Sequence, residues 1–125
     1  MIGTTCVLFI DDDVLSLQLM SRISDLLGFE AMISTSPQRG LEMAARQMPA
    51  LIIVDMQMDE MNGVEFVRQV RGLPRLARLP VLLCSAGMSL HDQDQARQAG
   101  ADGFIMKPIG VSVLQETVQR YAGAD

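Results

Sequence analysis

The sequence predicts an α/β fold in which five parallel strands form one sheet with helices on both of its faces. Short apolar runs of strand length alternate five times with longer segments whose apolar residues recur every three or four positions. The first, third and fourth runs are continuous in Val, Ile and Leu, as strands buried on both faces require. With 125 residues, 49% of them apolar, the chain can bury one sizeable core, so we expect a single domain over residues 1–125.

Five strands are expected from the apolar runs. They span Thr5 to Ile10, Glu30 to Ser34, Leu51 to Val54, Val81 to Cys84 and Gly103 to Met106. The second run, EAMIS, mixes polar and apolar residues and is typical of an edge strand.

Each strand is followed by a candidate helix. We expect the first helix to pack on the sheet through Leu15, Leu19, Ile23 and Leu26, and the last through Val111, Leu114, Val118 and Tyr121. Proline and glycine bound the second and third helices, expected at Gln38 to Met48 and Gly63 to Arg71. The fourth, from Met88 to Ala99, has few large apolar residues and should be weakly anchored.

Charge and composition exclude several classes of partner. The net charge is -5 and the chain has no run of Lys or Arg, which argues against binding to nucleic acid or to an anionic membrane surface. No stretch reaches the roughly 18 apolar residues of a membrane span, and the N-terminus lacks the features of a signal peptide. We therefore expect a cytoplasmic protein, with Cys6 and Cys84 as buried free thiols.

The polar residues that could form a reactive site lie at the ends of the predicted strands. In an open parallel sheet, ligands bind at the carboxyl ends of the strands, where the strand order reverses. A flavodoxin-like (βα)5 three-layer sandwich with strand order 2-1-3-4-5 has this reversal between strands one and three. In that order five residues converge: Asp11, Asp12, Asp55, Ser85 and Lys107.

A cluster of three carboxylates requires positive charge. Two carboxylates about 5 Å apart repel by roughly 3 kcal/mol at an effective dielectric near 20. Lys107, the only lysine among ten basic residues, supplies one cation. Hard oxygen ligands without nearby His or Cys favour Mg²⁺ as the other. Acidic residues at the start of a helix are also ordinary capping residues, and Asp13 fits that role best.

This set of groups favours phosphoryl transfer onto a carboxylate, because positioning and charge neutralisation are what such a reaction needs. Asp55 is the preferred nucleophile, since it directly follows a buried strand and opens the loop MQMDEMNG. The Ser85 hydroxyl and the Lys107 ammonium could both contact an incoming phosphoryl oxygen.

These residues lie in motifs that resemble those of the response-regulator receiver domains of two-component signalling. VLFIDDD resembles the first strand of that family with its acidic pair, and LIIVDMQMDEMNG resembles the phosphoacceptor segment. The resemblance implies metal-binding roles for Asp11, Asp12, Asp55 and the backbone carbonyl of Gln57. It implies that Asp55 accepts the phosphoryl group in the presence of Mg²⁺.

The remaining motifs extend the resemblance over nearly the whole chain. VLLCSAG places Ser85 at the Thr/Ser position of the family, and GADGFIMKP places Lys107 at its lysine. The family usually has a cis peptide at the position of Pro108, and Phe104 falls at its aromatic switch position. One residue departs from the pattern: Asp59 stands where receivers usually have proline.

As the resemblance implies, the donor is a phosphohistidine on a sensor histidine kinase or a histidine phosphotransfer protein. It would dock near Val14, Leu15 and Gln18 of the first helix. Phosphorylation would draw Ser85 toward the phosphoryl group, turn Phe104 inward and alter a partner-binding face. Such a domain catalyses only its own phosphorylation and dephosphorylation, and we expect no output domain in this chain.

Three other functions are compatible with parts of the pattern. An aspartyl phosphohydrolase would share the nucleophile and Mg²⁺, but Gln57 stands where those enzymes commonly have a second Asp. An FMN carrier would place its phosphate against acidic residues, which is repulsive. A receiver fold that binds partners without phosphorylation remains open because of Asp59.

Overall fold

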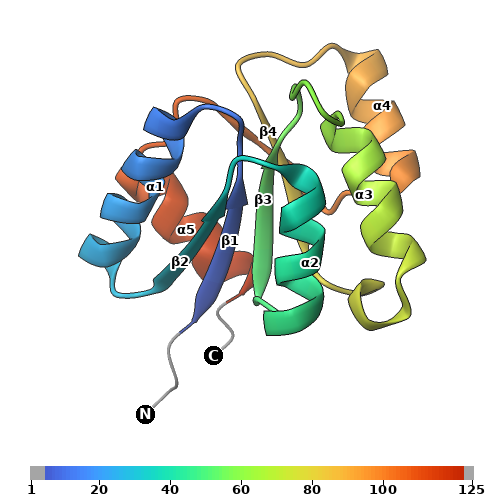
Figure 1. The fold of residues 1–125 in the computed structure, drawn as a ribbon. Coiled ribbons are helices and arrows are strands. Elements are labelled where there is room, and N and C mark those ends of the chain that lie inside the picture. Colours follow the sequence, from blue (N-terminus) through green and yellow to red (C-terminus); the bar gives the residue numbers. More distant parts are fainter. Residues whose placement is uncertain (1–4, 123–125) are drawn as a thin grey trace.

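The computed structural model describes residues 5–122, which form one parallel sheet covered by helices on both faces (Figure 1). The strand order is β2-β1-β3-β4-β5, as predicted, and all four strand pairs are parallel. The strands are β1 (Cys6–Ile10), β2 (Glu30–Ser34), β3 (Leu51–Asp55), β4 (Val81–Ser85) and β5 (Gly103–Met106). The sheet therefore has the order 2-1-3-4-5, with β2 at one edge and β5 at the other.

The helices form the two outer layers. They are α1 (Val14–Leu27), α2 (Pro37–Gln47), α3 (Gly63–Gly72), α4 (Leu90–Ala99) and α5 (Val111–Tyr121), with the short 3-10 helix η1 (Pro74–Leu76) after α3. Helices α1 and α5 cover one face of the sheet, whereas α2, α3 and α4 cover the other (Figure 1). This arrangement is the predicted flavodoxin-like three-layer sandwich.

Two apolar cores lie between the layers because successive side chains of a strand point to opposite faces. In β1, Leu8 and Ile10 pack into the core beneath α2 and α3, while Val7 and Phe9 pack into the core beneath α1 and α5. Strands β3 and β4 are buried along their whole lengths. The continuous apolar runs in the sequence therefore do mark strands buried on both faces.

Side chains that cap the helices fix where they begin, close to the ends of the strands. Asp13 accepts a hydrogen bond from the backbone N–H of Leu15 and caps α1, as the sequence predicts. Ser36, Asn62 and Ser89 cap α2, α3 and α4 in the same way. Side-chain caps therefore fix the starts of α1 to α4, whereas α5 begins after Gly110 without such a cap.

The prediction for the buried face of α1 is wrong. Leu15, Leu19 and Leu26 are 72%, 48% and 77% exposed, and only Ile23 of the predicted stripe is buried. The buried residues of α1 are Leu17, Met20, Ile23 and Ser24. Ser24 explains the error: its hydroxyl donates to the Met20 carbonyl at 2.7 Å, so a polar residue is accommodated in the buried face while leucines remain outside.

Smaller differences concern the ends of elements and single residues. Strands β3 and β4 extend one residue further than predicted and include Asp55 and Ser85. In α5, Leu114 and Val118 are buried, whereas Val111 is 43% exposed. Cys84 is buried as a free thiol, but Cys6 is only partly buried because it lies at the start of β1.

Helix α4 is weakly anchored, as expected. Ala96 is its only buried residue, whereas α3 buries Gly63, Val64, Phe66, Val67 and Val70. Among residues 5–122, no helix combines the length and the apolar character that crossing a bilayer requires.

Candidate functional site

The carboxyl ends of four strands bring the predicted site residues to one edge of the sheet. Asp11 follows β1, Asp55 and Ser85 are the last residues of β3 and β4, and Lys107 follows β5. Asp11, Asp55 and Ser85 are buried, with 7%, 9% and 8% of their surface exposed. Polar groups far apart in the sequence therefore meet in a partly desolvated pocket.

Lys107 is the cation at the centre of this pocket. Its Nζ lies 2.8 Å from Asp11 Oδ2 and 3.5 Å from Asp55 Oδ1. Burial lowers the pKa of Lys107, but the hydrogen bond with Asp11 and the charges of Asp11 and Asp55 outweigh burial, so the pKa lies above its ordinary value. The ammonium therefore stays charged at neutral pH.

Asp55 is buried next to another carboxylate. Burial is the largest cause that raises its pKa above the ordinary value, and the negative charge of Asp11 adds to it. Lys107 and a backbone hydrogen bond from Gln57 act in the opposite direction but do not cancel the rise. The ionised form of Asp55 is thus destabilised by its surroundings and would gain from further positive charge.

Three carboxylates have the arrangement that a divalent cation requires. Asp11, Asp12 and Asp55 each offer an oxygen, and these oxygens lie within 4.8 Å of one another. Asp12 is exposed to solvent, whereas the other two are buried. A hard cation such as Mg²⁺ is suited to this all-oxygen set and could keep waters on the side of Asp12.

Residues 56–62 between β3 and α3, which we call the acceptor loop because they follow the predicted acceptor Asp55, contact this cluster through their backbone. The N–H of Asp59 donates to Asp12 Oδ2 at 3.3 Å. Gln57 lies at the start of the same loop with its side chain exposed. The Asp59 contact could not be predicted from the sequence, because residue types give no information on a backbone N–H except where proline removes it.

The two predicted switch residues have their own contacts. The Ser85 hydroxyl donates to the Gly87 carbonyl at 2.9 Å and accepts from the Gly87 N–H at 3.1 Å. Phe104 is half-buried, and the guanidinium of Arg97 on α4 lies over its ring, 5.2 Å from the centroid. The Arg97 contact was also missed by sequence reasoning, since the two residues belong to different elements.

Two neighbours complete the pocket. The Lys107–Pro108 peptide is cis, as the resemblance implies. Cys84 lies beneath the site on β4, where burial raises the pKa of its thiol to about 12. A thiol with that pKa is not a nucleophile at neutral pH, so Cys84 is a packing residue, as expected.

Comparison with known proteins identifies the family. The family model described as "Response regulator receiver domain" matches residues 7–119. This chain belongs to the receiver-domain family. The match includes every strand from Val7 onward together with the acidic pair, Asp55, Ser85 and Lys107.

Individual relatives agree with this family. The receiver domain is 29% identical to the polar-differentiation response regulator DivK of Brucella ovis, over 96% of this chain and 98% of the relative. It superposes on the chemotaxis protein CheY4 of Vibrio cholerae with a TM-score of 0.90, 28% identity and coverage of 95% and 99%.

A third solved structure agrees in fold. It is the receiver domain of the sensor histidine kinase PA1611 from Pseudomonas aeruginosa, described as having a magnesium ion coordinated in its active site cleft. The TM-score is 0.88 at 21% identity, with coverage of 98% and 100%. This likeness concerns the fold.

Proposed function

We propose that the domain accepts a phosphoryl group on Asp55 from a phosphohistidine, with Mg²⁺ as cofactor, and that this modification changes a partner-binding face. The observation that carries the proposal is the meeting of Lys107 with the carboxylates of Asp11 and Asp55, at 2.8 and 3.5 Å, at the ends of the strands. Membership of the receiver-domain family supports the same reading.

The reaction follows from the surroundings of Asp55. A carboxylate oxygen of Asp55 would form a bond to phosphorus as the bond from phosphorus to the histidine nitrogen breaks, and the leaving imidazole takes up a proton from solvent. Lys107 Nζ already lies 3.5 Å from Asp55 Oδ1, so it can move from this carboxylate to a phosphoryl oxygen without leaving the site. Its retained positive charge would neutralise the transferred group.

Asp11, Asp12, Asp55 and the Gln57 carbonyl are the groups we assign to Mg²⁺. When bound, the ion would supply positive charge to the phosphoryl oxygens and relieve the repulsion among the carboxylates. Lys107 holds Asp11 in place at 2.8 Å, which leaves the exposed side of the cluster open to solvent and to a donor.

Ser85 and Phe104 would transmit the modification. To reach a phosphoryl oxygen, the Ser85 hydroxyl has to give up its two hydrogen bonds with Gly87. New charge-assisted hydrogen bonds would compensate for that loss. Movement of Phe104 would disturb its contact with Arg97 and so affect the weakly anchored α4.

The donor would dock beside α1. Val14 and Leu15 are 53% and 72% exposed next to the acidic site. A cavity of about 290 Å³ lies between α1 and the segment after β5, lined by Leu17, Leu19 and Ile109 among others. This apolar surface suits a kinase or phosphotransfer protein that must bring its histidine to Asp55.

We also propose that the domain is located in the cytoplasm.

The proposal is tested by intact-mass measurement after incubation with a small acyl phosphate, with and without Mg²⁺. Wild type should gain one phosphoryl group only with Mg²⁺, and Asp55→Asn should gain none. Asp25→Asn, which removes an exposed carboxylate of α1, is the matched control and should behave as wild type. An unmodified wild type, or sustained hydrolysis of phosphate esters in excess over protein, would reject the proposal.

A further inference from the structure

The three carboxylates of the site differ in what holds them. Lys107 contacts Asp11 and Asp55 directly. Asp12 is instead the acceptor of the backbone N–H of Asp59, at 3.3 Å between the nitrogen and Oδ2. The most exposed carboxylate of the cluster is therefore oriented by the acceptor loop and not by the lysine.

That N–H exists because of the residue type at position 59. Receiver domains usually have proline here, and proline has no backbone N–H to donate. Asp59 gives this chain a hydrogen-bond donor that a proline could not supply. A hydrogen bond to an ionised carboxylate is also stronger than one between neutral groups.

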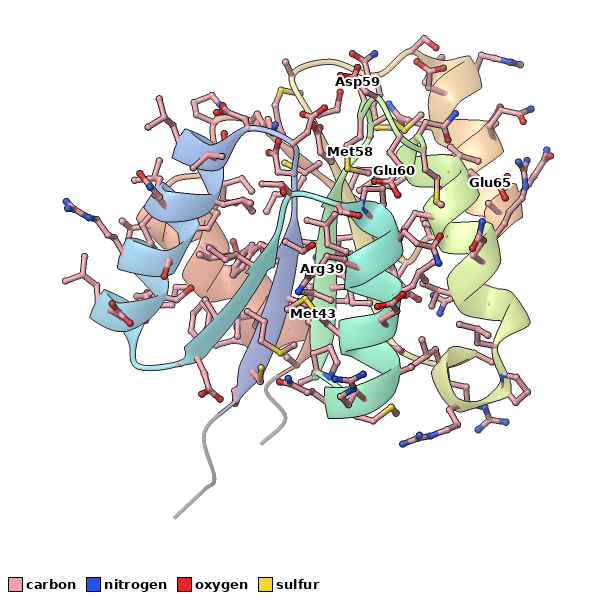
Figure 2. The ribbon with its side chains drawn as sticks, in the orientation of Figure 1. Arg39, Met43, Met58, Asp59, Glu60 and Glu65 are labelled. Carbon is pink, nitrogen blue, oxygen red and sulfur yellow. The ribbon has the colours of Figure 1, made fainter. Side chains whose placement is uncertain are left out.

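A second hydrogen bond, to the start of α2, also holds the acceptor loop in place. The Ser36 hydroxyl, which caps α2, donates to Glu60 Oε1 at 2.9 Å. Figure 2 shows Asp59 and Glu60 on the loop above the strand ends, with Arg39 and Met43 on the neighbouring α2. Asp59 and Glu60 thus join the loop to the segments after β1 and β2, and the position of the Asp59 N–H is defined by both contacts.

We propose that Asp59 is a positioning residue whose backbone N–H orients Asp12 and thereby couples binding of a divalent cation to the conformation of the acceptor loop. This inference rests on the proposed Mg²⁺ site. Because a carboxylate has two oxygens, Asp12 can accept from Asp59 through Oδ2 and still offer an oxygen to a cation. Since coupling is reciprocal, Mg²⁺ should in turn protect the Asp59 amide.

The decisive comparison is between Asp59→Pro and Asp59→Ala. Both remove the side-chain carboxylate, but only proline removes the N–H. Calorimetric titration with Mg²⁺ should give a dissociation constant roughly three- to tenfold larger for Asp59→Pro than for Asp59→Ala, the range that corresponds to the loss of one hydrogen bond. Asp25→Ala, which removes an exposed carboxylate near the C-terminal end of α1, is the control and should bind Mg²⁺ as wild type does.

A second measurement does not depend on the proline variant. The rate at which the Asp59 amide exchanges with solvent, measured by NMR, should fall in wild type on addition of Mg²⁺ and rise in metal-free Asp12→Ala. Equal Mg²⁺ affinities of Asp59→Ala and Asp59→Pro would overturn the positioning role alone. An exchange rate of the Asp59 amide that Asp12→Ala leaves unchanged would do the same. Wild type that binds no Mg²⁺ would overturn the metal site as well.

Discussion

The balance of charge around Asp55 decides how this residue behaves. Repulsion from the Asp11 carboxylate raises the pKa of Asp55, whereas the Lys107 ammonium, whose Nζ lies 3.5 Å from Asp55 Oδ1, lowers it. These charge effects oppose each other, and burial is the largest single cause. Burial therefore determines the direction, and the pKa of Asp55 lies above its ordinary value. Ionised Asp55, the proposed nucleophile, therefore destabilises the metal-free protein.

Neutralising Asp55 should stabilise the metal-free protein. The pKa of Asp55 is higher in the folded chain than in the unfolded chain. Protonated Asp55 therefore stabilises the fold below the unfolded pKa, and this stabilisation is lost as the pH rises through the folded pKa. At pH 7, Asp55→Asn should thus be more stable by about 1 kcal/mol, or about 3–5 °C in melting temperature. The contact between Lys107 and Asp11, 2.8 Å in wild type, does not involve Asp55 and should persist in this variant.

Thermal unfolding in chelator at a series of pH values checks this prediction. The difference between Asp55→Asn and wild type should shrink as the pH falls and vanish well below the ordinary aspartate pKa of about 3.9, where Asp55 is protonated in both the folded and the unfolded chain. Asp25→Asn, at an exposed position, should differ from wild type by less than about 0.5 kcal/mol throughout. If Asp55→Asn melts below wild type at pH 7, ionised Asp55 does not destabilise the metal-free protein, which would contradict the raised pKa of Asp55.

At the scale of elements, the start of α3 is packed directly against the strand that carries Asp55. The Gly63 N–H donates to the Met56 carbonyl at 2.8 Å. A Cβ added at Gly63 would lie 2.9 Å from Met56 Cα, 3.0 Å from the Asp55 carbonyl oxygen, and in overlap with the Leu83 side chain. Backbone atoms cannot yield as a flexible side chain can, so the absence of a side chain here sets the distance between α3 and the acceptor loop.

Gly63→Ala should therefore destabilise the domain by about 2 kcal/mol, since it forces overpacking against backbone. Gly72 at the other end of α3 is the matched control, because a Cβ there meets nothing within 4 Å. Gly72→Ala should be neutral or slightly stabilising through its higher helix propensity. Urea unfolding of both variants measures the difference, and equal effects of the two substitutions would show that packing at Gly63 is not the cause.

At the scale of the whole molecule, alternation of strand and helix was enough to predict the sheet order and both outer layers. The continuous apolar runs of β1, β3 and β4 left little choice of topology, and the strand order then brought Asp11, Asp55 and Lys107 together. The burial of α1 could not be predicted, because apolar residues lie on two sides of this helix and a hydrogen bond hides Ser24 in the core.

Two contacts between distant segments could not be predicted from residue types, one made by a backbone N–H and one between side chains. The Asp59 N–H reaches Asp12 because of how the acceptor loop folds between β3 and α3, and the sequence gives only the absence of proline. The Arg97–Phe104 contact likewise depends on the placement of α4 against β5.

The most direct measurement locates the phosphoryl group on the chain. Protein treated with an acyl phosphate and Mg²⁺ is reduced with borohydride, which converts an aspartyl phosphate to homoserine, and is then digested and sequenced by mass spectrometry. We predict conversion at Asp55, with the neighbouring Asp11, Asp12 and Asp59 unchanged. Conversion at another aspartate, or at none while the protein binds Mg²⁺, would contradict the role of Asp55 as the phosphoacceptor.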